Sequence, residues 1–368
     1  MESKLKIKVT QENLNKALST VAKVAGGRST LPILNNVLFQ IEDNRLSLSA
    51  TNLDIAIKEY VSSKIDSPGA LTIPARLIQD YVSNLPKTTI SIEQDEHKFK
   101  LKAENYESVV NGVPADEFPM MPHIKDGKTW EISAKELKKA LSQVVFAASS
   151  DEARPVLTGV FVHSDGKQLY VAATDSYRLA EKSASKFSEE VSLLIPASAM
   201  HDLLRVLTDD IEKIEVTNDS QQVLFRLGNI ELVARLIEGK YPDYQKLIPK
   251  DFAVSAEVSR DELINIAKVS SLFAREAAGS ITVSVDEDTG NLNIRSVASQ
   301  VGENTSSTNA KAKGSGDITL NSRYLLDGLQ AIDSENIVFG FNGKLDPIVL
   351  RAADDKSDYT HVIMPLKS

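Results

Sequence analysis

One spacing recurs throughout this chain of 368 residues. Three sets of anchor residues repeat at an interval of 123 positions (160 − 37 = 123 and 283 − 160 = 123): Val37, Val160 and Val283; Leu46, Leu169 and Leu292; Pro119, Pro242 and Pro365. Three unrelated anchors that keep one interval twice are hard to obtain by chance. The interval is far longer than a solenoid repeat and matches the size of an ordinary domain. The sequence therefore predicts three similar domains, at residues 1–123, 124–250 and 251–368.

Each predicted domain follows the same local pattern. A short alternating strand is followed by a helix, several strands, a second helix and further strands. Ser133 with Glu136, and Ser259 with Glu262, fit the capping box that opens a helix. This pattern favours antiparallel sheets with helices on one face. Each domain is therefore predicted to be a doubled βαβββ unit of the α+β class.

The stretch Arg154–Ala180 shows the pattern most clearly. Its two strand-like runs flank Asp165-Gly166, which predicts a hairpin turn. Leu31–Asp54 repeats the arrangement in the first domain. The two stretches are therefore predicted to occupy corresponding places in neighbouring domains.

Residues that could build a catalytic or metal centre are scarce. The chain has no Cys, which excludes disulfides and thiolate metal sites. Its five His residues stand in dissimilar contexts without metal-ligand spacing. The stretch Gly26–Thr30 follows a helix and precedes a strand, the wrong order for a P-loop, so a helix end and loop is the better interpretation. We expect no catalytic activity, no metal and no cofactor.

A carboxylate recurs on the second helix of each domain, at Asp80, Asp202 and Asp327. Because the three belong to different domains, we expect them to lie far apart. Arg76 and Arg323 stand four residues before two of them, which predicts helix-surface ion pairs and not a carboxylate site.

The N-terminal stretch and the hydropathy bear on location. Met1–Thr10 lacks the apolar core of a signal peptide, and no apolar run approaches the length of a membrane span. We therefore expect a cytoplasmic protein.

Charge gives a conflicting indication about nucleic acid. A net charge of −9 argues against such a partner, because nucleic-acid-binding domains are usually basic. Cationic residues nevertheless fall on or beside the predicted helices: Lys16, Lys23, Arg76, Lys138, Lys139, Arg205, Lys268, Arg275 and Arg323. On charge alone, solvated helix faces with mixed charges explain this pattern. Helices on one side of three similar domains would instead form one modestly basic surface, which suits sequence-independent contact with phosphates.

The C-terminal stretch His361–Ser368 is unusually apolar for a chain end. One interpretation is a last strand that completes its sheet. The other adds an apolar groove, lined by Val362, Met364, Pro365 and Leu366 beside Leu157, Thr174, Leu179, Pro242 and Leu247. Walls of Met, Leu and Pro suit a short peptide with Leu and aromatic anchors.

Five motifs then match one family over the whole chain: Thr30–Leu34, Arg154–Gly159, Ala173–Ala180, Glu238–Tyr244 and Met364–Leu366. They resemble the bacterial DNA polymerase III beta subunit, the sliding clamp. The resemblance implies a DNA clamp fold and a head-to-tail homodimeric ring of six similar domains, with helices on the inner face and antiparallel sheets outside. Double-stranded DNA would thread the ring without sequence preference. The ring would act as a processivity factor without catalytic activity, and its partners would be the replicative polymerase, the clamp loader and other proteins with a clamp-binding motif.

The resemblance also assigns site residues. The implied peptide-binding groove comprises Leu157, Thr174, Ser176, Tyr177, Arg178, Leu179, Pro242, Leu247, Asn321, Tyr324, Leu345, Pro347, Val362, Met364, Pro365 and Leu366. Tyr177 departs from the commoner His of the family. The residues expected to contact DNA are Arg28, by resemblance, and Lys16, Lys23, Arg76, Lys138, Lys139 and Arg205, by their helical positions.

The expected dimer contacts are Val110 in the first domain and Leu272 and Phe273 in the third. Ser108 stands where the family often has a large apolar residue. The alternative hypothesis is a peptide-binding scaffold protein that does not encircle DNA. An enzyme is the third and weakest hypothesis.

Overall fold

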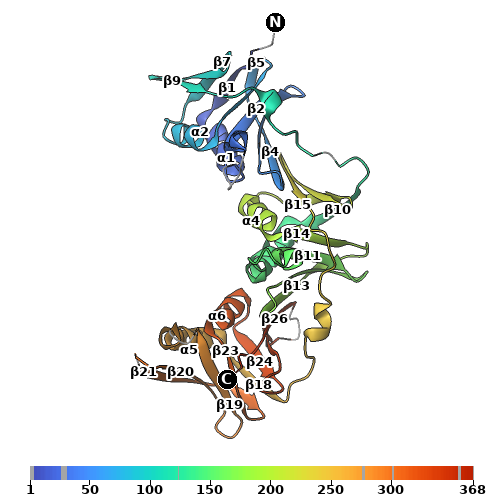
Figure 1. Cartoon of the computed structure of the whole chain (residues 1–368), viewed down its shortest axis with the longest axis vertical. Helices are drawn as coiled ribbons and strands as arrows, with labels where there is room; N and C mark the ends of the chain where they lie inside the picture. Colours follow the sequence, from blue (N-terminus) through green and yellow to red (C-terminus); the bar gives the residue numbers. More distant parts are fainter. Residues whose placement is uncertain are drawn as a thin grey trace. The chain divides into compact units, whose positions relative to one another are not determined.

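The computed structural model describes residues 4–25, 31–122, 124–275, 278–300, 302–354 and 358–367. The chain forms two compact units (Figure 1). Unit 1 joins Met1–Lys135 to His201–Leu236, and unit 2 joins Glu136–Met200 to Ile237–Ser368. The cut between the units therefore passes through the predicted second domain.

Unit 1 contains two antiparallel sheets. Their strand orders are β5-β1-β7-β8-β9 and β10-β15-β16-β17-β4-β3-β2-β6. The strands are β1 Lys6–Thr10, β2 Asn36–Glu42, β3 Arg45–Thr51, β4 Ile55–Val61, β5 Lys64–Ser67, β6 Ala70–Pro74, β7 Thr89–Asp95, β8 Lys98–Ala103, β9 Tyr106–Asn111, β10 Lys128–Ser133, β15 Lys213–Asn218, β16 Gln222–Leu227 and β17 Ile230–Arg235. Helices α1 (Gln11–Val21) and α2 (Ala75–Ser83) pack against each other, and α1 also packs on β3 and β4.

Unit 2 repeats this architecture. Its strand orders are β14-β11-β12-β13-β26-β25-β24-β18-β22 and β21-β20-β19-β23. The strands are β11 Gly159–Ser164, β12 Gln168–Thr174, β13 Arg178–Lys186, β14 Ser192–Pro196, β18 Val254–Ser259, β19 Ser280–Asp286, β20 Asn291–Ala298, β21 Gly302–Asn309, β22 Lys311–Lys313, β23 Gly316–Asn321, β24 Asn336–Phe341, β25 Ile348–Ala352 and β26 Tyr359–Ile363. Helix α5 (Arg260–Phe273) packs against α6 (Ser322–Ala331) and on β20 and β21.

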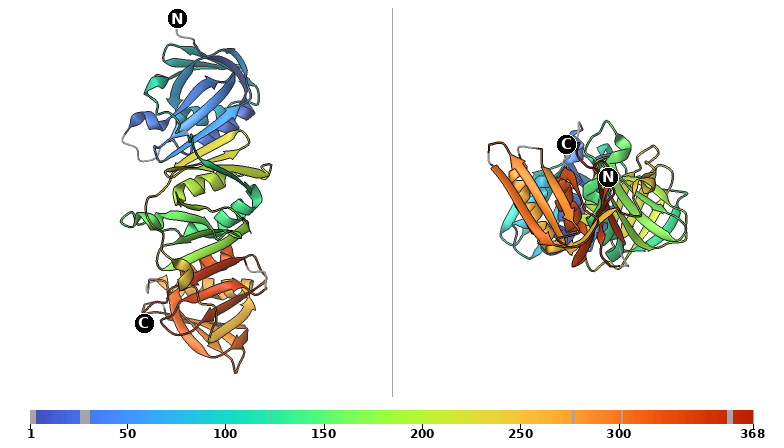
Figure 2. Two further views of the ribbon diagram at one scale, coloured as in Figure 1. Left: turned by 90° about the vertical axis from the view of Figure 1, so that its right-hand side faces the viewer. Right: turned by 90° about the horizontal axis from the view of Figure 1, so that it is seen from below.

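Two helices belong to the predicted second domain. They are α3 (Ala134–Val144) and α4 (Ala197–Val206). The mixture of antiparallel sheets with a few helices confirms the α+β prediction, and Figure 2 shows these sheets from two further directions.

Each long sheet contains a strand pair that joins two predicted domains. In unit 1, β17 pairs antiparallel with β4, and Val233 lies opposite Ala56. In unit 2, β26 pairs antiparallel with β13, and Val362 lies opposite Leu179. Ala56 and Leu179 are 123 positions apart (179 − 56 = 123). The two pairs are therefore copies of one joint, which we call the β4–β17 joint and the β13–β26 joint.

Local signals in the sequence explain where several elements begin. The side chain of Thr10 accepts a hydrogen bond from the backbone N–H of Asn13 at the start of α1, and Ser259 caps α5 in the same way. The predicted Asp165-Gly166 turn joins β11 to β12, and Gly166 adopts a φ of 82° that glycine tolerates without strain. The carboxylate of Asp165 accepts backbone hydrogen bonds from the two residues that close the turn, which fixes the hairpin.

Among the described residues, no helix is both long and apolar enough to span a membrane. The same residues contain no group of three or more His, Asp or Glu side chains that could hold a metal ion.

Candidate protein-binding and nucleic-acid surfaces

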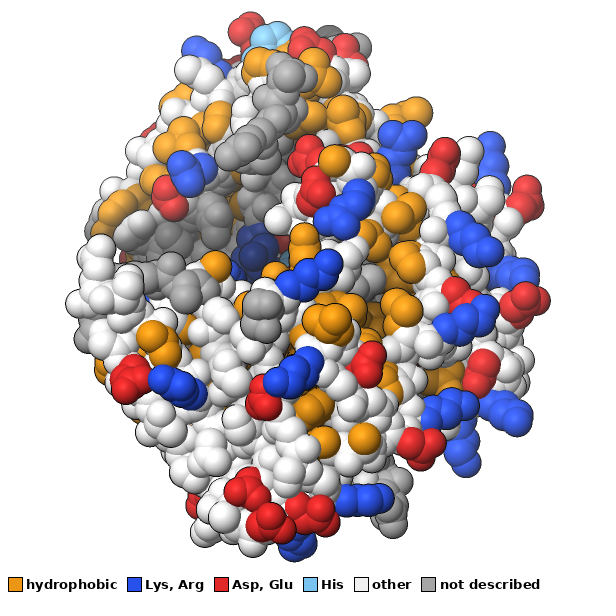
Figure 3. Space-filling view, turned by 60° about the horizontal axis from the view of Figure 1, so that its bottom comes forward, with side chains coloured by type: hydrophobic (Ala, Val, Ile, Leu, Met, Phe, Trp, Pro, Cys, Tyr) orange, Lys and Arg blue, Asp and Glu red, His pale blue; other side chains and the backbone are white. Residues whose placement is uncertain are grey.

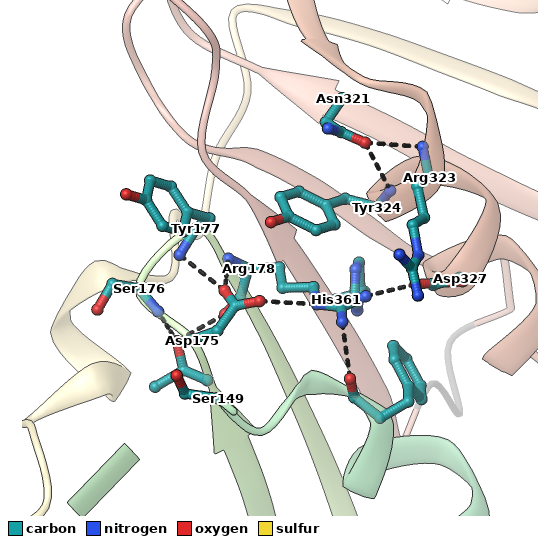
Figure 4. Close-up of polar contacts among 12 residues, drawn as sticks. Ser149, Asp175, Ser176, Tyr177, Arg178, Asn321, Arg323, Tyr324, Asp327 and His361 are labelled. Carbon is teal, nitrogen blue, oxygen red and sulfur yellow. Dashed lines mark hydrogen bonds and ion pairs between the residues drawn. The ribbon is translucent and has the colours of Figure 1, made fainter. Parts of the chain in front are cut away.

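The loop between β12 and β13 is held by its own side chains (Figure 4). The carboxylate of Asp175 accepts hydrogen bonds from the backbone N–H groups of Tyr177 and Arg178, both at 2.9 Å. The hydroxyl of Thr174 donates to the carbonyl of Arg178 at 2.6 Å and accepts from the N–H of Ser176 at 3.1 Å. These bonds hold Ser176 at a φ of 79° and leave Tyr177 exposed at the tip. We call residues 174–178 the Arg178 loop.

Arg178 ties this loop to the rest of unit 2. Its guanidinium donates to the carboxylates of Asp175 at 3.1 Å and Asp327 at 2.5 Å, and to the carbonyl of Phe146 at 2.7 Å. The guanidinium also lies 4.7 Å from the ring centre of Tyr324, a cation–π contact. The side chain is only 10% exposed, so its charge is neutralised by these partners and not by water. Arg178 is therefore a structural link between the predicted second and third domains.

A buried imidazole lies beside this ion pair. His361 is fully buried in β26, and its Nδ1 is 3.2 Å from the hydroxyl of Tyr359. Burial, followed by repulsion from Arg178, lowers the pKa of His361 to about 3. His361 is therefore neutral at physiological pH, so the positive charge at this point of unit 2 is the Arg178 guanidinium.

The C-terminal strand runs alongside the Arg178 loop. Leu179 lies opposite Val362 in the ladder, and the N–H of Met364 donates to the carbonyl of Tyr177 at 2.8 Å. Two residues further on, the N–H of Leu366 donates to the carbonyl of Thr319 at 2.8 Å. These backbone hydrogen bonds therefore hold the apolar chain end in place, which fixes the positions from which its side chains project.

The predicted groove residues differ in how exposed their side chains are. The buried members are Leu157, Thr174, Leu179 and Val362. The half-buried members are Arg178, Asn321, Tyr324, Pro347, Pro365 and Leu366. The exposed members are Ser176, Tyr177, Pro242, Leu247, Leu345 and Met364. The exposed apolar side chains include Leu345 at 68%, Leu247 at 59%, Tyr177 at 58% and Met364 at 39%.

The contacts join some predicted groove residues and not others. Ladder pairs and hydrogen bonds connect the Arg178 loop to Leu179, Val362 and Met364, and the Tyr324 ring contacts Arg178. Asn321 caps the same helix, α6, that carries Tyr324. The described polar contacts do not connect Leu247, Leu345 or Pro347 to this loop: they lie in the 3-10 helix Tyr244–Leu247 and between β24 and β25.

Three predicted DNA-contacting residues line one cavity in unit 1. Lys16 on α1, Lys23 just beyond it and Arg205 on α4 all contribute to a cavity of about 540 Å³. Arg205 is paired with Asp202 at 3.0 Å, whereas Lys16 and Lys23 are exposed. The structure therefore brings cations from two predicted domains to one place.

The remaining predicted DNA contacts are dispersed. Arg76 is exposed on α2, and Lys138 is half-buried on α3. Lys139 forms an ion pair with Asp333 at 3.0 Å. Arg28 lies outside the described residues. On the face drawn in Figure 3, Lys and Arg side chains are interspersed with Asp and Glu, so no uniform charge covers that face.

One expectation about carboxylates is wrong. Asp327 was expected to pair with Arg323 on its own helix, but its carboxylate binds Arg178 from another predicted domain. Asp202, in contrast, has a local partner, Arg205, three residues along α4. The helical spacing predicted a local partner because it contains no information about side chains 149 positions away.

Comparison with known proteins is consistent with these features. Family models described as DNA polymerase III beta subunit match in three parts: the N-terminal domain at residues 5–122, the central domain at 131–243 and the C-terminal domain at 245–367. A beta sliding clamp of Staphylococcus epidermidis is 30% identical over 366 residues, covering 95% of this chain and 96% of the relative. The chain belongs to the bacterial beta sliding clamp family.

Other relatives and solved structures agree. A beta sliding clamp of Synechococcus elongatus is 31% identical over 373 residues, with 99% of each chain covered. The Bacillus subtilis DNA polymerase sliding clamp superposes with a TM-score of 0.94 at 28% identity, with 99% of each chain covered. A Pseudomonas aeruginosa sliding clamp, solved bound to griselimycin, gives 0.93 at 26% identity, covering 99% of this chain and 100% of that one.

The predicted dimer contacts of this clamp differ in exposure. Val110 is only 7% exposed, because alternate residues of β9 face the core. The exposed apolar side chains of this strand are Tyr106, at 50%, and Val109, at 56%. Leu272 is 54% exposed at the end of α5, and Phe273 is half-buried.

Sequence reasoning missed two residues that hold the Arg178 loop. Asp175 was read only as part of a family motif, although an Asp followed by Ser and Tyr after a strand is a signal for an Asx turn. Asp327 was assigned to a helix surface, and no local signal marks its partner.

Proposed function

We propose that this clamp closes into a head-to-tail homodimeric ring around double-stranded DNA. The ring would hold the replicative polymerase, the clamp loader and other proteins with a clamp-binding motif at its peptide-binding groove. The chain would act as a processivity factor in the cytoplasm, without catalytic activity of its own. Its three clamp domains would span residues 1–123, 124–250 and 251–368.

The proposal of ring closure rests on two open sheet edges. Strand β9 ends the five-stranded sheet of unit 1, and β21 ends the four-stranded sheet of unit 2. In the order of its sheet, β9 corresponds to β17 and β26, and β21 corresponds to β4 and β13. Because β17 pairs with β4 and β26 pairs with β13, the missing third joint is β9 with β21 of another copy. Open strand edges are normally protected or paired.

The two internal joints also predict the register of the third. In them, Val233 lies opposite Ala56 and Val362 lies opposite Leu179. Following the repeat through the neighbouring ladders gives the corresponding residues: Lys100 lies opposite Val109 in one ladder, and Val297 lies opposite Glu303 in the other. Val109 of one copy would therefore lie opposite Glu303 of the other, with Ser108 beside this contact.

Exposed cations support the DNA contact. Lys16, Lys23 and Arg205 line one cavity and would attract phosphates without reading bases. The net charge of −9 keeps this attraction weak, which suits a ring that slides. Arg76, Lys138 and Lys139 would face DNA by their helical positions, and Arg28 by family resemblance.

Exposed apolar side chains support the peptide contact. Tyr177 and Met364 offer apolar surface at the fixed backbone of the Arg178 loop, and Leu247 and Leu345 are exposed elsewhere in unit 2. A peptide that carries Leu and aromatic anchors would bury this surface. The alternative of a scaffold that does not encircle DNA has no observation of its own in its favour.

Cross-linking tests ring closure directly. The chain has no Cys, so Val109→Cys combined with Glu303→Cys introduces the only thiols. Under mild oxidation we expect covalently closed dimers, which run as one doubly linked species on a non-reducing gel. The matched control pairs Val109→Cys with Thr305→Cys, two positions out of register on the same strand. Equal cross-linking of both pairs, or none in either, would contradict the proposed joint.

A further inference from the structure

A second candidate ligand site lies in unit 1, close to the β4–β17 joint. It consists of two cavities of about 440 and 450 Å³, which share Glu42, Lys58 and Met121 in their walls. We propose that these cavities bind a short peptide segment in which an apolar side chain stands next to a basic one. This site is distinct from the peptide-binding groove of unit 2.

The corresponding region of unit 2 is filled with aromatic rings. Tyr244 stands 123 positions after Met121 (244 − 121 = 123) and is buried. Its hydroxyl is 2.7 Å from Nε2 of His163, and its ring packs edge-on against Tyr241 at 6.2 Å. Tyr241 stacks in turn on Phe161 at 4.9 Å. These rings fill the space between the segment that carries Tyr241 and Tyr244 and strand β11, which carries Phe161 and His163.

In unit 1 the same positions carry smaller or more flexible side chains. Leu38 stands in the place of Phe161 (161 − 38 = 123), and Gln40 stands in the place of His163 (163 − 40 = 123). Together with Met121 in place of Tyr244, three ring systems are replaced by unbranched or aliphatic side chains. All three of these residues line the first cavity, and Met121 also lines the second.

The walls combine polar side chains with apolar ones that can adapt to a ligand. Phe118 and Met120 contribute to the first cavity, and Leu224 and Val233 to the second. Met121 separates the two, and an unbranched thioether can change rotamer to admit a side chain. The volumes lie in the range of ordinary ligand sites. Such walls suit a Leu or Phe side chain.

The charges of the walls favour a basic neighbour. Lys58 is already paired with Glu42 at 2.7 Å, and Arg226 is paired with two glutamates. The two other carboxylates, Asp43 on the second cavity and Asp116 on the first, are exposed. In the part of the chain that the structure describes, these two make no ion pair and accept no side-chain hydrogen bond. The ligand that complements them is therefore cationic next to its apolar group.

Methionine methyl NMR on the full-length protein tests the proposal. The chain contains five Met, and Met120 and Met121 report on the cavities, while Met364 reports on the peptide-binding groove of unit 2. The probe is the capped tripeptide Phe-Leu-Arg, and its matched control is Phe-Leu-Glu. We expect the Arg peptide to shift the Met120 and Met121 signals saturably, with at least tenfold higher affinity than the Glu peptide.

One variant gives unit 1 the tyrosine that unit 2 has at the equivalent position. Met121→Tyr should weaken binding at least tenfold, read from the Met120 signal, whereas Met121→Leu should bind like the wild type. The other methyl signals report whether each variant folds. Unmoved Met120 and Met121 signals in the wild type, or equal shifts with both peptides, would overturn the proposal. A shift of Met364 alone would also overturn it, while leaving the proposed groove of unit 2 supported.

Discussion

Arg178 shows how one side chain can serve several elements of a clamp. Its guanidinium binds two carboxylates and a backbone carbonyl, and it packs on the ring of Tyr324. A planar fork of five donors can satisfy such a set, which a lysine ammonium could not. The conformation of the exposed Tyr177 therefore depends on a buried neighbour.

Replacement of Arg178 by Ala should destabilise unit 2. The change leaves Asp175 and Asp327 without their cation, and breaking a buried ion pair costs about 3–5 kcal/mol. Urea unfolding gives this loss as a lower free energy of unfolding. Arg154→Ala is the matched control, because Arg154 is exposed and should contribute less than about 1 kcal/mol. Equal losses in both variants would contradict the role of Arg178.

His361 should make stability depend on pH. Its folded-state pKa of about 3 lies below the unfolded value of 6.5, so the unfolded chain binds the proton first. Neutral His361 therefore costs no stability above pH 6.5, and its effect lowers the free energy of unfolding as the pH falls from 6.5 towards 3. From pH 8 to pH 5 this group should lower the free energy of unfolding by up to about 2 kcal/mol.

The measurement compares urea unfolding of the wild type and His361→Phe at both pH values. The difference between pH 8 and pH 5 should be smaller in the variant, whatever its absolute stability. Carboxylates that titrate near pH 5 contribute equally to both proteins. An unchanged pH dependence would show that folding does not lower the pKa of His361.

The loops that precede the two joint strands are copies of one another. In unit 1, Asn52 accepts backbone hydrogen bonds from Asp54 and Ile55, just as Asp175 does in unit 2. Leu53 has a φ of 80°, close to the 79° of Ser176, its equivalent 123 positions later (176 − 53 = 123). One turn chemistry thus serves both joints, although only the loop in unit 2 carries an arginine at its end.

Double replacement of Met364 and Leu366 by Ala should abolish binding of the polymerase peptide. Both residues follow the end of β26, and their hydrogen bonds to Tyr177 and Thr319 come from the backbone, so the ladder and the Arg178 contacts should persist. Fluorescence anisotropy of a labelled peptide gives the affinity, and a loss of at least tenfold is expected for two truncated apolar contacts. Retained binding in the folded variant would place the peptide elsewhere.

Much of this architecture could be predicted from the sequence because its signals are local or repeated. The 123-residue interval, the Asp165-Gly166 turn and the cap at Ser259 depend on neighbours within a few positions or on arithmetic. The facing of Val110 could not be predicted, since a shift of one residue in a strand exchanges its two faces. The Arg178–Asp327 pair joins residues 149 positions apart, and helical periodicity does not contain that contact.

At the scale of the whole molecule, the proposed clamp holds DNA by enclosure. Two copies of one strand joint lie within the chain, and the free edges β9 and β21 have the order required for the third. A closed ring needs little affinity for DNA, which is consistent with an acidic chain that carries scattered helix cations.

Retention on circular DNA is the most direct test of that claim. Protein loaded on a nicked circle should remain bound in gel filtration at high salt, because topology and not charge holds it. Cutting the circle once should release the protein within the same experiment. Loss from the intact circle at high salt, or persistence on the cut DNA, would contradict the encircling ring.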